Sequence, residues 1–168
     1  ATVVIARHIF EHASDPRRFA AALAALMAPD GFLIIEIPDC EKAISMRDYT
    51  TVWEEHSLYF TPHMFCAGME SLGFAIQKTS CIPYVLENSL IAIMKRTDRR
   101  LHKRSTSEGV AQEIDRATLF ADGFAGRRSE IVGTLERVRR EHGRIAIFGA
   151  GHLACTYINF FGLGDLID

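Results

Sequence analysis

The feature that most constrains this chain is the sequence TVVIARHIFEH at residues 2–12, in which five apolar or β-branched residues precede charged and imidazole groups. An unbroken apolar run without alternation is typical of a strand buried on both faces inside a parallel sheet. In open α/β sheets, ligands bind outside the carboxyl ends of the strands. The polar side chains after this run are therefore expected where chemistry is done, unless they are only loop residues and a first helical turn. They are Arg7, His8, Glu11 and His12.

Composition excludes several classes of function. The chain has 168 residues, of which 48% are hydrophobic, so it can bury a sizeable core. A formal net charge of -2 and a pI near 6.4 give no general attraction to nucleic acid or to an anionic membrane, and neither partner is predicted. The four cysteines are widely separated and form no C-x-x-C pair, which indicates a reducing, cytoplasmic setting.

The first half of the chain predicts alternating strands and helices. Residues 17–27 are rich in alanine and leucine and predict a helix, and residues 32–37 predict a second apolar strand. Strand, helix and strand in this order predict a right-handed parallel crossover. A helix at residues 62–72 follows. Residues 74–80 and 89–95 then predict two strands that pair antiparallel at the edge of the sheet.

A change in composition predicts the division into domains. From Thr97 the sequence becomes a charged linker, RTDRRLHKRSTSEG. We therefore expect one domain at residues 1–96, a linker with a long helix at residues 97–142, and the start of a second α/β unit at residues 143–168. Because the chain begins nearly inside a strand and stops after an apolar pair, it is expected to be a piece of a longer protein.

The long helix carries apolar residues at a 4-3-4-3 spacing. A break is expected near Gly123 or Gly126. Such a stripe packs either on a neighbour within the same chain or in a homodimer through residues 110–142.

The last segment contains a glycine-rich turn. Residues 144–148, RIAIF, predict a strand, and a helix to residue 161 follows the turn. Gly149, Gly151 and Ala154 satisfy the G-x-G-x-x-G/A fingerprint, in which backbone amides approach a phosphate at a helix N-terminus. The alternatives are a nucleotide site at this turn or glycines that only turn the chain tightly.

The sequence HIFEH at residues 8–12 matches H-x-x-E-H, the inverted zinc-protease signature. That chemistry requires both histidines on one helix, one turn apart. Because His8 follows a β-branched strand, the geometry is wrong for a protease. The sequence predicts no metal site.

Three stretches together carry a resemblance to a known family. They are RHIFEHASDPRRF, MAPDGFLIIEIPD and EEHSLYFTPHMFCAGMESLGF. In combination they resemble the second half of a class I S-adenosylmethionine (SAM)-dependent methyltransferase. With the C-terminal GAG-containing segment, the chain is similar to sugar C-methyltransferases. The resemblance implies a Rossmann-like, seven-stranded α/β sheet that ends in an antiparallel hairpin, with SAM as cofactor.

The resemblance also implies where the cofactor lies. The family's glycine-rich loop and acidic residue, which bind most of SAM, would lie upstream of Ala1, so this piece is expected to lack the SAM-binding half and to be inactive alone. By the same resemblance, Ala6, Arg7 and His8 would contact the methionine and sulfonium end of the cofactor. The acceptor would lie near Glu55 and His56.

Related sugar C-methyltransferases use a Y-x-E-H arrangement to remove a proton beside a ketone, and this chain has Trp53-Glu54-Glu55-His56 instead. The resemblance implies His56 as general base, Glu55 as its orienting neighbour and His8 as a further catalytic residue. Because Trp53 supplies no hydroxyl, ketosugar chemistry is less supported than methyl transfer itself.

We therefore predict methyl transfer from SAM to a small, sugar-like acceptor such as a nucleotide sugar. The alternatives are an NAD(P)-dependent oxidoreductase or nucleotide-binding module at the glycine turn, and a non-catalytic dimerising scaffold.

Overall fold

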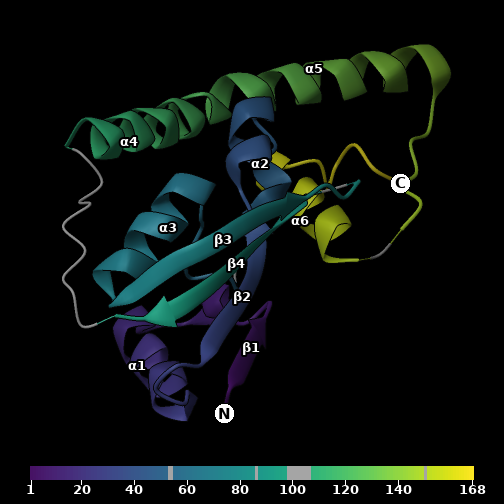
Figure 1. The fold of residues 1–168 in the computed structure, drawn as a ribbon. Helices are drawn as coiled ribbons and strands as arrows, with labels where there is room; N and C mark the ends of the chain where they lie inside the picture. Colours follow the sequence, from purple (N-terminus) through teal and green to yellow (C-terminus); the bar gives the residue numbers. More distant parts are fainter. Residues whose placement is uncertain (53–54, 86, 98–106, 150) are drawn as a thin grey trace. The chain divides into compact units, whose positions relative to one another are not determined.

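The computed structural model describes residues 1–52, 55–85, 87–97, 107–149 and 151–168 (Figure 1). Within these residues the chain divides into two compact units. The first, called the sheet unit, comprises Ala1–Lys42 and Glu54–Ile114, and the second, called the helical unit, comprises Ala43–Trp53 and Asp115–Asp168. The predicted domain boundary at Thr97 adjoins residues 98–106, which lie outside the described residues, and the three-part division stays a prediction.

The sheet unit alternates strands and helices. Its elements are β1 (Val3–Arg7), the 3-10 helix η1 (Phe10–His12), α1 (Pro16–Leu26), β2 (Phe32–Asp39), α3 (Pro62–Ser71), β3 (Phe74–Ile82) and β4 (Asn88–Arg96). Two further helices, α2 (Glu41–Met46) and α4 (Ser107–Asp122), contribute residues to both units.

The two long helices of the sheet unit begin at capping side chains. The Asp15 carboxylate accepts a hydrogen bond from the Arg18 backbone N–H at 3.0 Å, and Pro16 occupies the first position of α1. Thr61 caps α3 in the same way, through its hydroxyl and the Met64 N–H. Both caps satisfy backbone donors that a helix start leaves unpaired.

The sheet has the strand order β1-β2-β4-β3. β1 and β2 are parallel, with Val3 opposite Phe32 and Arg7 opposite Glu36. β4 lies between β2 and β3 and is antiparallel to both. The predicted parallel neighbours and the predicted antiparallel pair are therefore confirmed. This mixed α/β sheet is consistent with part of a Rossmann-like methyltransferase fold.

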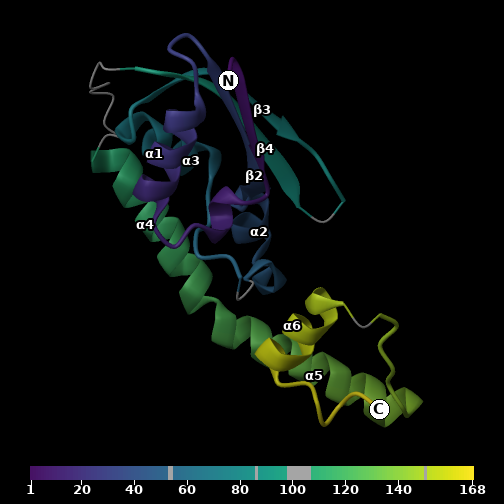
Figure 2. The same cartoon turned by 90° about the horizontal axis from the view of Figure 1, so that it is seen from below.

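Burial alternates along β1, whereas β2 is buried at every position from Ile35 to Asp39. Figure 2 shows α1 and α3 on the same side of the sheet, and the core between them holds Leu33, Ile35 and Phe65, each fully buried. The prediction that the first strand is buried on both faces is wrong for this structure. β1 is at the edge of the described sheet, and its outward-facing Val3 and Ile5 are 47% and 62% exposed.

The helical unit packs around three buried side chains, Tyr49, Phe161 and Leu163. Its remaining elements are the 3-10 helix η2 (Tyr49–Thr51), α5 (Phe124–His142) and α6 (His152–Phe161). The predicted break in the long helix is confirmed at Gly123, which separates α4 from α5. A Cβ there would lie 2.9 Å from the Tyr49 hydroxyl, so a side chain would collide with the buried cluster.

The apolar stripe of the long helix is covered in part within the chain, because Ile131 and Leu135 pack on the buried cluster of the helical unit. The homodimer through this helix stays a prediction.

The predicted strand at residues 144–148 is not formed. Among the described residues, this segment makes a backbone hydrogen bond with Asp168. The Asp168 N–H donates to the Ile145 carbonyl at 2.8 Å. A strand needs a ladder of such bonds with a neighbour, and one contact does not make a ladder. The predicted helix after the glycine turn is confirmed as α6. No helix in the described part of the chain has the length and apolar composition that a membrane crossing requires.

Candidate functional site

The carboxyl ends of β1 and β2 lie next to each other because the two strands are parallel. His8 follows β1 directly, and its backbone N–H donates to the Glu36 carbonyl at 2.9 Å. The φ angle of His8 is +47°, a left-handed conformation that is uncommon for residues other than glycine. This turn ends the strand and leads the chain into η1, which carries Glu11 and His12.

An ion-pair network surrounds Glu36, which is 7% exposed. Arg7 donates from Nε to Oε2 and, at 3.2 Å, from Nη2 to Oε1. The Ser89 hydroxyl donates to Oε1 at 2.8 Å, and His8 Nε2 lies 3.4 Å from the same oxygen. The Arg7 hydrogen bond, helped by Ser89 and opposed by burial, lowers the pKa of Glu36 from 4.5 to about 2. Glu36 is therefore a carboxylate over the whole physiological range.

A second group of titratable side chains forms where η1 meets the loop that precedes α3. One potential ligand atom from each of Glu11, His12 and His56 lies within 4.8 Å of the other two. The rings of His12 and His56 meet edge to face, with centroids 4.8 Å apart. Glu11 is 2% exposed, and its Oε1 lies 3.5 Å from His8 Nδ1. We refer to Glu11, His12 and His56 as the Glu-His-His cluster.

Backbone hydrogen bonds explain how His56 reaches η1 from a distant part of the sequence. The N–H groups of Ser57 and Leu58 both donate to the Glu11 carbonyl, at 2.9 and 3.0 Å. In return, His12 Nδ1 bonds to the Glu55 carbonyl at 2.8 Å. These contacts hold the loop against η1 on both sides of His56.

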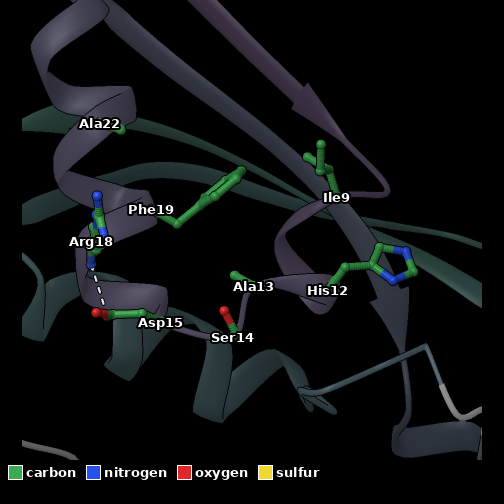
Figure 3. Close-up of a pocket in the computed structure, with 8 residues that line it drawn as sticks. All are labelled: Ile9, His12, Ala13, Ser14, Asp15, Arg18, Phe19 and Ala22. Atoms are coloured by element: carbon green, nitrogen blue, oxygen red, sulfur yellow. Dashed lines mark hydrogen bonds between the residues drawn. The ribbon is translucent and has the colours of Figure 1, made fainter.

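A pocket of about 440 Å³ opens beside His12, between η1 and the start of α1. Figure 3 shows Ile9 and His12 on one side of it, with Phe19 and Ala22 of α1 on the other. Its rim carries Ser14, whose side chain is exposed. The pocket offers apolar walls, one imidazole and the charged side chains of Asp15 and Arg18 to a small molecule.

The residues predicted for the cofactor and for catalysis lie at the end of β1 and on the loop that packs against η1, all within the sheet unit. Ala6 is buried in β1, and the Arg7 and His8 side chains are 63% and 47% exposed at the end of the strand. Glu55 is exposed and contributes its carbonyl to His12, and His56 is half-buried. The roles of these residues stay predictions. Trp53 and Glu54, the first half of the W-x-E-H sequence, lie outside the described residues.

The glycine turn belongs to the helical unit. Gly149 has a φ of +124°, Gly151 caps α6, and Ala154 lies in the first turn of that helix. A Cβ added at either glycine would meet nothing within 4 Å, so no close backbone contact among the described residues requires glycine there. Because the preceding strand is not formed, the turn lacks the strand-turn-helix context of a dinucleotide site. Nucleotide binding by this turn stays a prediction.

Sequence reasoning missed the Glu36 network and the assembly of the Glu-His-His cluster. The sequence held one signal for the Glu36 network. Glu36 interrupts an otherwise apolar strand, and a buried charge needs partners. Ser89 gave no such signal, because its position beside Glu36 depends on the strand order.

Comparison with known proteins agrees with the geometry of the sheet unit. Residues 1–79, just under half of the chain, match a family described as a methyltransferase domain. A C-methyltransferase of Streptomyces niveus, NovU, is 30% identical over 76 residues, which make up 45% of this chain and 18% of that relative. The match thus spans less than a fifth of the length of the relative. Both findings confirm the predicted resemblance to a class I SAM-dependent methyltransferase of the sugar C-methyltransferase kind.

Proposed function

We propose that this protein transfers a methyl group from SAM to a carbon or oxygen of a small, sugar-like acceptor, such as a nucleotide-linked sugar. The observation that carries the proposal is the convergence of His8, His12 and His56 at the carboxyl end of β1. All three residues lie within the segment that matches the methyltransferase domain. The similarity to a C-methyltransferase supports the same class of reaction.

The residues at the end of β1 fit the amino-acid end of the cofactor. The Arg7 guanidinium has five N–H donors, of which its contacts with Glu36 use two, and its side chain is 63% exposed. It can therefore hold a carboxylate while it remains paired with Glu36. Ala6 and His8 would line the adjacent part of the site. When bound, SAM supplies a methyl group that its sulfonium activates for in-line transfer.

The histidines of this chain would supply proton transfer. Imidazole is suited to general base catalysis because its ordinary pKa lies near neutrality. In the proposed reaction, His56 accepts the proton of an acceptor C–H or O–H as the nucleophile forms its bond to the methyl carbon. The backbone contacts of Glu55, Ser57 and Leu58 support this role, since they hold His56 in place. Most of the rate enhancement would come from positioning.

The free cysteines favour a reducing compartment, so a cytoplasmic location is part of the proposal.

The test is the effect of His56→Ala on turnover in the full-length protein, with labelled SAM and a panel of nucleotide-linked sugars that carry a ketone or a free hydroxyl. Removal of a general base should lower kcat by about 100-fold or more. His63→Ala, an exposed histidine on α3, is the matched control and should leave kcat unchanged. If His56→Ala retains near-normal kcat and changes only KM, His56 shapes the acceptor site and is not the base.

A further inference from the structure

We propose that Glu11, His12 and His56 bind a divalent first-row transition metal ion of the zinc class. One potential ligand atom from each residue already lies within 4.8 Å of the other two. Donor atoms around a tetrahedral zinc ion are about 3.4 Å apart, so movements on the order of 1 Å would close the site. Rotation of the half-buried His56 side chain would supply this movement while the backbone contacts of its loop stay in place.

The Glu11 side chain gives an independent reason to expect a cation. Glu11 is 2% exposed, and its Oε2 has no hydrogen-bond partner among the described residues. A buried carboxylate oxygen without a partner is costly, and such oxygens are normally hydrogen-bonded or coordinate a metal. The other oxygen, Oε1, faces His8 Nδ1 at 3.5 Å, which leaves one oxygen to act as a ligand.

The His12 ring is held as metal-bound histidines commonly are. Because a carbonyl oxygen can only accept, the 2.8 Å contact between His12 Nδ1 and the Glu55 carbonyl requires a proton on Nδ1. The lone pair of the neutral ring is therefore on Nε2. A backbone carbonyl in this position is a frequent outer partner of ligating histidines, since it fixes both tautomer and ring orientation.

The donor set selects the class of metal. Two imidazoles and one carboxylate suit zinc, cobalt, nickel or iron, whereas magnesium and calcium prefer oxygen ligands alone. Three protein ligands leave a position open for water or for an oxygen of a substrate. This inference goes beyond the proposed function, because a nitrogen that ligates a metal cannot also accept a proton. A metal ion bound there would therefore block proton abstraction by His56 and inhibit the proposed methyl transfer.

The experiment is metal binding by the untagged, chelator-treated full-length protein. We expect Zn²⁺ to bind with one-to-one stoichiometry in calorimetry, and Co²⁺ to give the visible absorption of a four- or five-coordinate nitrogen-oxygen site. His56→Gln and His12→Gln should each weaken Zn²⁺ binding by about 100-fold or more. The exposed His63 supplies the control His63→Gln, which should bind as the wild type does. Mg²⁺ should not compete.

Glu11→Gln tests the buried ligand, and far-UV circular dichroism of each variant checks its fold. His56→Gln keeps the test valid if Glu11→Gln does not fold, because His56 is half-buried on a loop. The proposal is overturned if Zn²⁺ does not bind, if a folded His56→Gln variant binds as the control does, or if Mg²⁺ binds in place of Zn²⁺. Because the readout is metal binding, its failure is distinct from a failure of methyl transfer.

Discussion

The clearest quantitative prediction concerns Glu36, the carboxylate that receives hydrogen bonds from Arg7 and Ser89. Its pKa falls from 4.5 to about 2 in the folded protein, mainly through the Arg7 contact. Such a difference corresponds to at most about 3 kcal/mol of stability at neutral pH. Because the Arg7 side chain is 63% exposed, solvent screens the pair. We therefore expect Glu36→Gln to lower the free energy of unfolding by about 1–2 kcal/mol.

The contribution of Glu36 to the free energy of unfolding depends on pH with a definite sign. The unfolded chain takes up the Glu36 proton as the pH falls through about 4.5, whereas the folded protein resists until about pH 2. Between these values the unfolded state binds more protons, so the contribution of Glu36 is complete above about pH 5 and decreases toward pH 2. The difference in unfolding free energy between wild type and Glu36→Gln should therefore narrow below about pH 4.

The assay is urea unfolding followed by circular dichroism at about pH 7, 5 and 3. Glu136→Gln, on the exposed face of α5, serves as the matched control and should change the unfolding free energy by less than about 0.5 kcal/mol at each pH. A difference between wild type and Glu36→Gln that stays constant from pH 7 to pH 3 would refute the reasoning, as would no difference at pH 7.

Two further pairs of residues give matched predictions. Gly162 has a φ of +65°, so Gly162→Ala should lower the free energy of unfolding by about 1 kcal/mol, whereas Gly133→Ala, within α5 and in open space, should raise it by about 0.5–1 kcal/mol. Thermal melts that shift in the same direction for both would contradict this. Cys40 is 4% exposed, and burial raises the pKa of its thiol to about 11. Near pH 8, iodoacetamide should modify Cys40 at least about tenfold more slowly than the exposed Cys155, as peptide mass spectrometry would measure; equal rates would contradict it.

The order of elements in the sheet unit could be predicted because local signals agree with the tertiary structure. Two apolar runs joined by a capped helix give the parallel pair of β1 and β2, and close spacing gives the antiparallel pair of β3 and β4. Burial could not be predicted in the same way. The apolar composition of β1 is compatible with a central strand, and only the strand order shows that Val3 and Ile5 are on an exposed face.

The prediction of a strand at residues 144–148 was wrong for a related reason. Alternating arginine, isoleucine and alanine suit a strand, but local propensity does not supply a partner. The structure gives this segment a contact with Asp168 and no ladder among the described residues.

The Glu36 network shows which part of a site depends on strand register. Arg7 is directly opposite Glu36 in the parallel pair, so its side chain faces the carboxylate on the same side of the sheet. Ser89 is opposite Pro38, two residues further along β2, and is therefore a diagonal neighbour of Glu36 on that face. Glu36 and Ser89 are 53 residues apart in the sequence, and no local sequence pattern indicates this contact.

The H-x-x-E-H sequence shows how a motif can be wrong in its geometry and still mark the residues that matter. The structure confirms that residues 2–12 are not a continuous helix, so His8 and His12 cannot form the histidine pair of a zinc protease. Because the chain turns at His8 and enters η1, Glu11 becomes buried while His12 stays accessible. His56, from the loop before α3, lies beside His12, with the two ring centroids 4.8 Å apart. A metal ion would occupy the same His12–His56 face that an acceptor proton would meet, so bound Zn²⁺ should inhibit methyl transfer.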